Sequence, residues 1–380
     1  MRSVCFVRAF CLLLATVLLV SGAAPAPTEL RSPWDKPVQA ATTESGACGH
    51  PPDLPAGITA SDYYSDSAHS VVDPGRLKAY RRAVAPLQHA AQSVVAMADR
   101  YRTDGDMAAA DCGAQWLDRF AADGVLTGRM SSNQADYVQG WMLGAFAVAW
   151  LKIRPAVQNP DPAVRAQVTS WLAQVADNIR RYYDPRIGKT DARNNHRYWA
   201  GFEVMAAGIA ADRRDLFDWG IASFEVGANQ ITADGTLPLE MARRSLALHY
   251  HLFATAPLVA MAELGAANGI DLYSRNNHAL ARLVDCAVAG ITAPDWFAAK
   301  AGVAQEPIRL DADDIGWAAP FALRYPNPRL AMLLAKTPSR SILYLGGLPP
   351  AQGSSMQPKA ADGFTRRGRD GSSQPQRSGR

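Results

Sequence analysis

The residue types best suited to chemistry lie together in one short stretch, residues 191–200. It holds two adjacent amides, an imidazole, a phenol, an indole and two guanidiniums, and an apolar run follows. On a helix, Asn195 and Trp199 are four residues apart and share a face, with His196 beside them. Free backbone amides at the start of such a helix also favour an anion. These groups suit a site that binds a charged sugar ring.

A second candidate segment is residues 243–253, Arg-Arg-Ser-Leu-Ala-Leu-His-Tyr-His-Leu-Phe. If it is helical, Arg243 and Tyr250 are nearly two turns apart and share one face. Apolar residues surround them, and a buried polar group without a partner is costly. One interpretation is structural: a core tyrosine bonded to a carbonyl and an arginine paired with Glu240. The other is functional: this segment and residues 191–200 form two halves of one site.

Several motifs resemble the alginate lyases of polysaccharide lyase family 5. They are Asn-Asn-His-Arg-Tyr-Trp-Ala at 194–200, residues 212–219, Leu-Pro-Leu-Glu at 237–240, Arg243 with Tyr250-His251, residues 268–272 and 345–347. The resemblance runs from about Cys48 to Gly347. It implies an all-α fold, an incomplete (α/α)6 toroid of antiparallel helix hairpins with a long groove. It also implies β-elimination of a 1,4-linked uronan without a metal ion or other cofactor.

The chemistry of β-elimination explains these residue types. The reaction removes the C5 proton, α to a carboxylate, and donors aimed at that carboxylate stabilise the enolate-like state. By the resemblance, Asn195 and Arg243 fill this role. Tyr250 matches the family's tyrosine, which serves as both base and acid when the proton and the leaving oxygen lie on one side of the ring. His196 matches its histidine, as a neutraliser or as the base for the opposite epimer.

Four further side chains are candidates for binding the substrate. Trp199 is expected to stack on a sugar face, and Tyr63, Arg197 and Arg244 complete the group. Basic residues are also concentrated within 18 positions: Arg180, Arg181, Arg186, Lys189, Arg193 and Arg197. Local positive charge of this kind suits an anionic polysaccharide.

Two positions depart from the family pattern. Asp62 stands where the alginate-cutting members have a lysine near the start of the groove. Phe253 stands where they have a second tyrosine, three residues past the catalytic one. The four catalytic candidates are retained, so elimination is better supported than alginate itself. A neighbouring polyuronate such as a glucuronan is an alternative substrate.

Two other classes of function remain open. A glycoside hydrolase on a similar toroid needs two carboxylates flanking the bond, and Asp191, Glu203 and Glu240 form no evident pair. A non-catalytic uronan-binding protein, acting with exopolysaccharide export machinery, is supported only by the two departures at Asp62 and Phe253.

The start of the chain predicts a signal peptide over residues 1–23. Arg2 and Arg8 precede an apolar run from about Phe10 to Val20, and small residues follow. The run is shorter than the roughly 20 residues of a membrane-spanning helix. The alternative, an uncleaved anchor, lacks a stop-transfer pattern. We therefore expect a periplasmic protein that leaves the membrane after cleavage.

The rest of the chain divides by composition. Residues 24–60 are a Pro-, Thr- and Ala-rich loop lead-in, residues 61–350 are one α/α-toroid lyase domain, and residues 351–380 are a basic, disordered tail. The net charge of +4 comprises +2 in the signal peptide and +4 in the tail, which leaves −2 for the remainder. That remainder lacks the basic footprint of a nucleic-acid-binding protein.

Cysteine usage fits an oxidising compartment. Cys5 and Cys11 leave with the signal peptide, and Cys48, Cys112 and Cys286 remain. We expect a Cys48–Cys112 disulfide with Cys286 buried and free. No Cys-x-x-Cys motif or His/Cys spacing suggests a metal site.

Apolar periodicity predicts helices that position these groups. The first begins at Asp73-Pro74, where Asp caps free amides and Pro suits the first turn, and Pro86 should kink it. Further helices are expected over 106–122, 133–153, 162–182, 195–211, 213–228, 239–266, 274–290, 293–302, 313–325 and 327–336. Residues 341–345 are the one candidate strand. Asn276-Asn277-His278 repeats the earlier Asn-Asn-His and is interpreted as a helix start with a partly exposed histidine.

Overall fold

The computed structural model describes residues 29–41, 48–156 and 162–350. Its longer helices are α1 (Pro74–Asp104), α2 (Met107–Ala122), α3 (Asn133–Ile153), α4 (Pro162–Tyr183), α5 (Asn195–Ala210), α6 (Arg214–Ala228), α8 (Ala247–Ala267), α9 (Arg275–Thr292) and α13 (Pro328–Lys336). Short ones are η1 (Asp184–Arg186), α7 (Pro238–Met241), η2 (Arg244–Leu246), α10 (Asp295–Ala301), α11 (Ala312–Ile315), α12 (Ala318–Arg324) and η3 (Leu343–Leu345). Within these ranges the chain forms isolated β-bridges and no strand, so the all-α prediction is confirmed. The predicted signal peptide and tail lie outside the described residues.

Local sequence explains the helix starts. Asp73 caps α1 by accepting a hydrogen bond from the Arg76 amide at 2.8 Å, and Pro74 occupies the first turn. Asn194 caps α5 in the same way, accepting from the His196 amide at 3.1 Å. The cap places the Asn-Asn-His motif at the N-terminal end of α5.

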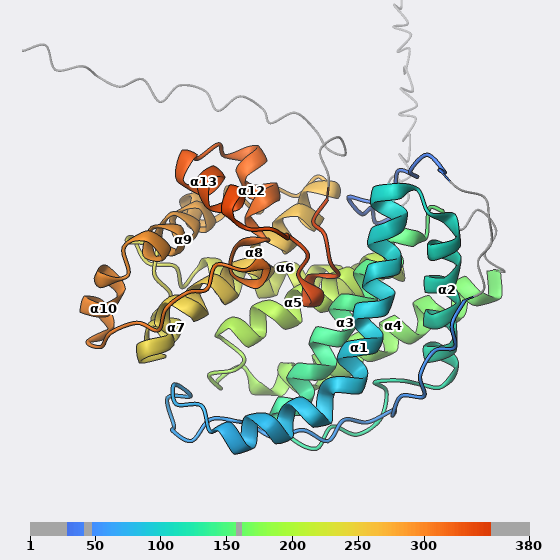
Figure 1. Cartoon of the computed structure of the whole chain (residues 1–380), viewed down its shortest axis with the longest axis horizontal. Helices are drawn as coiled ribbons and strands as arrows, with labels where there is room; N and C mark the ends of the chain where they lie inside the picture. The colour runs from blue at the N-terminus through green and yellow to red at the C-terminus, as the bar shows by residue number, and fades with distance from the viewer. Residues whose placement is uncertain (1–28, 42–47, 157–161, 351–380) are drawn as a thin grey trace, which may run out of the picture.

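The helices form an inner and an outer layer, and successive long helices alternate between the two (Figure 1). Helices α1, α3, α5 and α8 pack against one another in chain order and make the inner layer. Helices α2, α4, α6 and α9 each follow an inner helix and pack on its outer side, and α12 with α13 continues the pattern beside α8. This is the expected incomplete toroid of helix hairpins. The fully buried Phe146, Val148 and Trp150 confirm that α3 lies inside.

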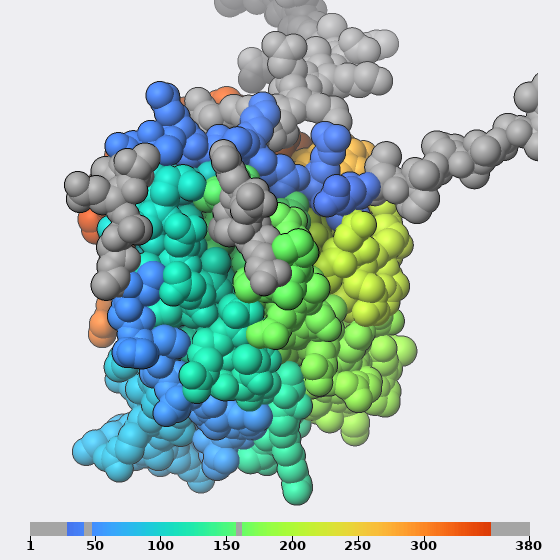
Figure 2. All heavy atoms as spheres, turned by 90° about the vertical axis from the view of Figure 1, so that its right-hand side faces the viewer, coloured from blue at the N-terminus to red at the C-terminus, as the bar shows by residue number. Residues whose placement is uncertain are grey.

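The two ends of the described chain fasten the first hairpin. The N-terminal segment lies across the outer surface of the helices that follow it (Figure 2), and Cys48 forms the predicted disulfide with Cys112 of α2. Cys286 is free, as expected, although it is only partly buried. At the C-terminal end, buried Lys152 donates to Asp99 and to the Gly346 carbonyl, each at 2.6 Å, and so ties α3, α1 and the final segment together.

The expected helix over residues 239–266 is wrong in one respect. The chain instead forms α7, then η2, then α8, because Arg244 takes a left-handed backbone with φ of 54° that no α-helix accommodates. By length and composition, residues 244–267 also pass as a membrane span. Most of the segment is buried against its neighbours, as in the core helix of a soluble protein.

The remaining comparisons between prediction and structure concern the C-terminal half and α1. The helix expected over 313–325 is interrupted between α11 and α12. The candidate strand at 341–345 is wrong, because the segment forms η3. Asn276, Asn277 and His278 do open α9, but all three have left-handed backbones and His278 is exposed. Helix α1 continues through Pro86, and in Figure 1 its first turns run at an angle to the remainder.

Candidate active site

Arg243 and Tyr250 meet, although not by sharing one helix. Arg243 lies between α7 and η2, and Tyr250 lies in the first turn of α8. The Arg243 guanidinium carbon stands 3.4 Å from the centre of the Tyr250 ring, and both side chains are largely buried. The two side chains therefore lie together even though the continuous helix on which the prediction was based is absent.

The loop before α1 covers this pair from the other side. The Tyr64 hydroxyl lies 2.5 Å from the Tyr250 hydroxyl. Arg243 donates from Nε and Nη2 to the His69 carbonyl, at 3.2 and 2.5 Å. Tyr64 was not among the sequence candidates, although its neighbour Tyr63 was. The adjacent pair of tyrosines was the only signal for it.

The buried hydroxyl of Tyr250 keeps its proton near neutral pH. Burial raises the pKa of Tyr250 to about 12, although the charge of Arg243 opposes the rise. Hydrogen bonds to Tyr64 and Arg243 also lower the pKa, but burial prevails. The unliganded protein therefore presents a neutral phenol at this position.

His196 is held flat against an aromatic ring that sequence reasoning did not identify. Tyr137 of α3 stacks on the imidazole with ring centres 3.7 Å apart and planes inclined by 17°. Burial and then the positive charge of Arg243 lower the pKa of His196 to about 3, so the imidazole is neutral at ordinary pH. Its Nδ1 has no hydrogen-bond partner among the described residues. The neutral imidazole thus has Nδ1 available for a hydrogen bond to a ligand, although its low pKa makes it a weak base in the unliganded protein.

Asp191 anchors the wall behind His196. The carboxylate accepts hydrogen bonds from the hydroxyls of Tyr137 and Tyr182, at 3.1 and 2.9 Å, and from Arg186 Nη2 at 2.8 Å. Burial alone would raise the pKa of Asp191, but the bonds from Arg186 and the tyrosines lower it overall. Asp191 is therefore an ionised structural group that orients Tyr137.

Asn195 lies at the base of the site and is bound by an acidic residue. Its backbone amide donates to Glu240 Oε1 at 2.7 Å and its Nδ2 donates to Glu240 Oε2 at 2.9 Å. Both residues are 0% exposed. Burial raises the pKa of Glu240 to about 7, against the opposing effect of the Asn195 bonds and of Arg243. The structure thus brings together all four catalytic candidates and adds Tyr64, Tyr137 and Glu240.

Two substrate-binding predictions are contradicted. Trp199 is only 2% exposed and packs against Phe253 with ring centres 4.9 Å apart, because α5 is buried on nearly every side. It has no free face for a sugar. Arg197 points toward α6, where its guanidinium lies 3.7 Å from the centre of the Trp219 ring.

Several of the basic side chains in residues 180–197 form ion pairs or ring contacts within the protein. Arg180 pairs with Asp215 at 2.8 Å and Arg186 pairs with Asp191 at the same distance. The concentration of arginines around residue 186 therefore braces helices more than it offers charge to an anion.

The remaining two binding candidates stay predictions. Tyr63 is partly buried between the rings of Tyr64 and Tyr80, at 4.6 and 5.0 Å. Arg244 is exposed next to Arg243. Asp62, the departure from the family pattern, lies 3.2 Å from His69 Nδ1 within the covering loop.

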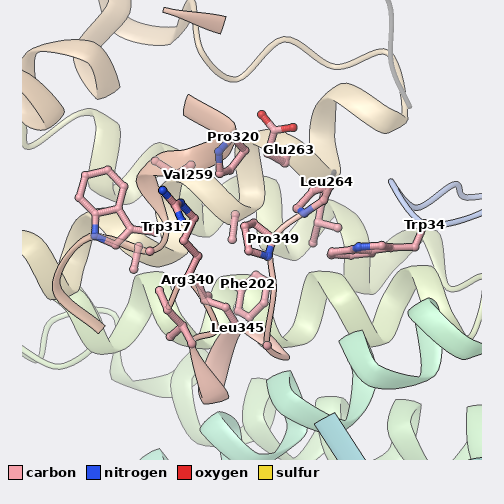
Figure 3. Close-up of a pocket in the computed structure, with 16 residues that line it drawn as sticks. Trp34, Phe202, Val259, Glu263, Leu264, Trp317, Pro320, Arg340, Leu345 and Pro349 are labelled. Atoms are coloured by element: carbon pink, nitrogen blue, oxygen red, sulfur yellow. The ribbon is translucent and has the colours of Figure 1, made fainter. Parts of the chain in front are cut away.

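A hollow beside the site is polar, whereas another pocket in the molecule is not. Tyr182 lines an open hollow together with Asp136, Asn178 and Arg181. The other pocket is mainly apolar and is not lined by any of the catalytic candidates (Figure 3). It is formed by α5, α8, Trp34, the start of α12 and the C-terminal segment from Arg340 to Pro350. Such a lining does not suit a polyanion. No group of three or more His, Cys, Asp or Glu side chains among the described residues is arranged to hold a metal ion.

Comparisons with known proteins agree with this picture. The family model described as alginate lyase matches residues 57–297. A polysaccharide lyase of Stenotrophomonas maltophilia is 40% identical over 76% of this chain and 85% of its own length. An alginate lyase of Azotobacter vinelandii is 35% identical over 81% of this chain and 84% of its own length.

Solved structures show the same fold. A histidine-to-alanine variant of alginate lyase A1-III, complexed with a tetrasaccharide, matches with a TM-score of 0.70 at 23% identity, over 84% of this chain and 95% of that one. Alginate lyase A1-III from Sphingomonas species A1 matches with a TM-score of 0.66 at 23% identity, over 79% and 84%. The incomplete α/α toroid is thereby confirmed. Because the family model spans more than half of the chain and relatives above 30% identity cover most of it, the chain belongs to the alginate lyase family of polysaccharide lyases.

Proposed function

We propose that this polysaccharide lyase acts in the periplasm and cleaves a 1,4-linked polyuronate, with polymannuronate as its first substrate. The reaction is a β-elimination that uses no metal ion and leaves a 4,5-unsaturated uronate end. The observation that carries the proposal is the contact of Arg243 with Tyr250, whose hydroxyl is 2.5 Å from that of Tyr64. A guanidinium and a protonated phenol stand together there, next to a neutral imidazole.

Each group has a defined task in the elimination. Arg243 neutralises the uronate carboxylate, so that the C5 proton becomes acidic enough to remove. The C5–H bond breaks as its electrons form the C4=C5 double bond and the C4–O bond breaks. A neutral Tyr250 supplies a proton to the departing oxygen while the neutral His196 accepts the C5 proton. If Tyr250 has first passed its proton on, its phenolate accepts the C5 proton and then donates that proton to the departing oxygen. The contact with Tyr64 offers a path by which Tyr250 exchanges its proton.

Related proteins support a sugar ligand at this site. The solved structures with bound tetrasaccharide are a histidine-to-alanine and a tyrosine-to-phenylalanine variant of alginate lyase A1-III. The Azotobacter vinelandii relative is called an alginate lyase, whereas the Stenotrophomonas maltophilia relative has the broader name polysaccharide lyase. These names support an acidic polysaccharide and leave the choice among polyuronates to experiment.

A glucuronan is the second candidate substrate, because of Asp62 and Phe253. Mannuronate and glucuronate differ at C2 but have the same arrangement at C4 and C5, so one tyrosine can serve both. The polymer is then selected by contacts away from the bond that breaks. Asp62 belongs to the loop over the site, and Phe253 lies against Tyr250 with ring centres 6.2 Å apart.

The experiment compares kcat/KM on polymannuronate, polyguluronate and polyglucuronate, followed by the ultraviolet absorbance of the new double bond. We expect the highest value on polymannuronate and measurable turnover of polyglucuronate. Tyr250→Phe and His196→Ala should each lose at least about 100-fold in kcat with unchanged helical circular dichroism. His278→Ala, an exposed histidine on α9, is the matched control. Uronan binding without turnover by the parent protein would instead support the non-catalytic role in polysaccharide export.

The proposed location has its own test. When the full chain is produced in a Gram-negative host, we expect periplasmic protein whose N-terminal residue is Ala24. Protein in the membrane fraction that still begins with Met1 would contradict the signal-peptide prediction.

A further inference from the structure

The amide of Asn195 faces the wrong way for the task that β-elimination gives it. Its Nδ2, the group able to donate to a substrate carboxylate, donates to Glu240 at 2.9 Å. Its Oδ1 is buried and has no hydrogen-bond partner among the described residues. An unpaired buried oxygen is unfavourable, and a uronate carboxylate bound beside this oxygen would be repelled by it.

The same two residues offer a second arrangement with no loss of hydrogen bonds. If Glu240 is protonated on Oε2, that oxygen becomes a donor. Turning the Asn195 amide over then lets Oδ1 accept from Glu240 and frees both Nδ2 hydrogens for the substrate. The bond from the Asn195 backbone amide to Glu240 Oε1, at 2.7 Å, is unaffected. The protonated pair satisfies the oxygen that the ionised pair leaves unpaired.

Few charged groups lie close enough to Glu240 to affect its protonation. Arg243, on the segment that follows α7, is the nearby cation, and on α5 the titratable neighbour is Tyr198. On α8, the ring of His251 is already committed to the Leu237 amide and the Ala247 carbonyl, at 2.9 and 2.7 Å. Burial outweighs Arg243 and holds the pKa of Glu240 at about 7. The carboxyl therefore changes its state within the working range of the enzyme.

We propose that Glu240 is a positioning residue operated by a proton: a uronate entering the site draws one proton from solvent onto Glu240, and the Asn195 amide turns its Nδ2 toward the substrate carboxylate. The inference rests on the proposed function, since it assumes a uronate carboxylate beside Asn195. Binding of an anionic sugar is then linked to proton uptake by a residue that never touches the sugar.

Glutamine at position 240 separates this role from a merely structural one. A glutamine can accept from the Asn195 backbone amide through Oε1 and donate to Oδ1 through Nε2, and so mimics protonated glutamate permanently. If ionised Glu240 only holds Asn195 in its present orientation, glutamine replaces an acceptor with a donor and is as damaging as alanine.

The first measurement is calorimetric binding of a mannuronate tetrasaccharide, at pH 7.5, in buffers with different ionisation enthalpies. In the inactive Tyr250→Phe protein we expect uptake of up to about 0.75 proton per ligand bound, because a carboxyl with a pKa of about 7 is already about one quarter protonated at pH 7.5. In the Tyr250→Phe/Glu240→Gln protein we expect binding with that uptake abolished. Equal proton uptake in the two proteins would overturn the proposal.

The second measurement is the pH profile of kcat/KM for polymannuronate. We expect Glu240→Gln to stay within about threefold of the parent at pH 6.5 and to lose the parent's decline above pH 7, whereas Glu240→Ala loses about 100-fold or more throughout. Glutamine as poor as alanine would overturn the proposal. A parent protein that binds the tetrasaccharide but makes no unsaturated product would overturn the proposed reaction only, because the calorimetric comparison needs no turnover.

Discussion

The hydroxyl of Tyr250 depends on two neighbours that come from distant parts of the chain. Arg243 lies over its ring and Tyr64 contacts its oxygen. Arg243 is in turn held by the His69 carbonyl, so residues 64 and 69 of one loop fix both groups. This geometry makes the covering loop part of the proposed catalytic site, and the proposal gives Tyr64 the task of exchanging a proton with Tyr250.

Removing only the Tyr64 hydroxyl should therefore slow the reaction. We expect Tyr64→Phe to lose about 10- to 100-fold in kcat, because Tyr250 loses its proton-exchange partner while the ring packing remains. The rate of double-bond formation is the measurement. Tyr325→Phe, on the far side of α12, should leave the rate unchanged. If the Tyr64→Phe protein were as fast as the parent, the Tyr64 hydroxyl would have no part in the reaction.

Trp199 should matter for stability and not for sugar stacking. Because the indole is buried against Phe253, we expect Trp199→Ala to lower the free energy of unfolding by about 3–5 kcal/mol. Trp199→Phe should cost less and leave KM nearly unchanged. Urea unfolding and steady-state kinetics measure the two quantities. A large rise in KM with full stability would restore the stacking role.

At the scale of elements, α5 positions the site by being buried nearly all round. Its N-terminal end carries Asn195 and His196, and its interior side carries Glu203. Glu203 is 2% exposed, and its Oε1 has no hydrogen-bond partner within the described part of the chain. Burial raises the pKa of Glu203 well above its ordinary value of 4.5. A β-carbon at Gly140 of α3 would collide with this carboxyl, so the close approach of α3 and α5 requires glycine there.

The neutral Glu203 predicts how stability changes with pH. The folded state keeps a proton that the unfolded chain releases above about pH 4.5, so the free energy of unfolding falls as pH rises above that value. We expect Glu203→Gln to be more stable than the parent at pH 8 and to lose that advantage at pH 4. Thermal unfolding at the two pH values measures this.

Glu263→Gln is the matched control for Glu203. Glu263 is bonded to Arg324 at 2.6 Å, so the same substitution should weaken the protein at pH 8. A Glu203→Gln protein that unfolds at a lower temperature than the parent at pH 8 would contradict the interpretation that the Glu203 carboxyl is buried without a group that stabilises its charge.

Element limits could be predicted from sequence where a cap and an apolar period coincide. Helices α2 to α6 begin within about two residues of the expected positions, and Asp73 and Asn194 show why. The break between α7 and α8 was missed, because the left-handed backbone of Arg244 has no signature in an apolar pattern that continues across it. The burial of Trp199 was missed since both helix faces of α5 carry aromatic or small residues.

At the scale of the whole molecule, the site exists only because the curved array brings separate hairpins together. Tyr64 and Tyr250 are 186 positions apart in sequence. Asn195 and Glu240 belong to different hairpins, and Tyr137 comes from a third. Local sequence patterns identify the four catalytic candidates, Asn195, His196, Arg243 and Tyr250, through their motifs. They cannot supply the contacts, which depend on how the inner helices are arranged.

The disulfide should stabilise this arrangement at its N-terminal edge. Cys48 and Cys112 enclose 64 positions, and closing such a loop in the unfolded chain contributes about 4 kcal/mol. We expect the Cys48→Ser/Cys112→Ser protein to unfold more readily by about 2–4 kcal/mol while keeping its activity at 25 °C. Denaturant unfolding measures this, with Cys286→Ser as the control. Unchanged stability would show that the bridge adds nothing to the folded array.

The central claim, cleavage of a polyuronate by elimination through Arg243 and Tyr250, is tested most directly by counting two products of the same cut. Purified protein is incubated with polymannuronate, and unsaturated ends are counted by ultraviolet absorbance while reducing ends are counted chemically. We predict one unsaturated end for each new reducing end, and neither with Tyr250→Phe. New reducing ends without ultraviolet absorbance would contradict the claim and indicate hydrolysis.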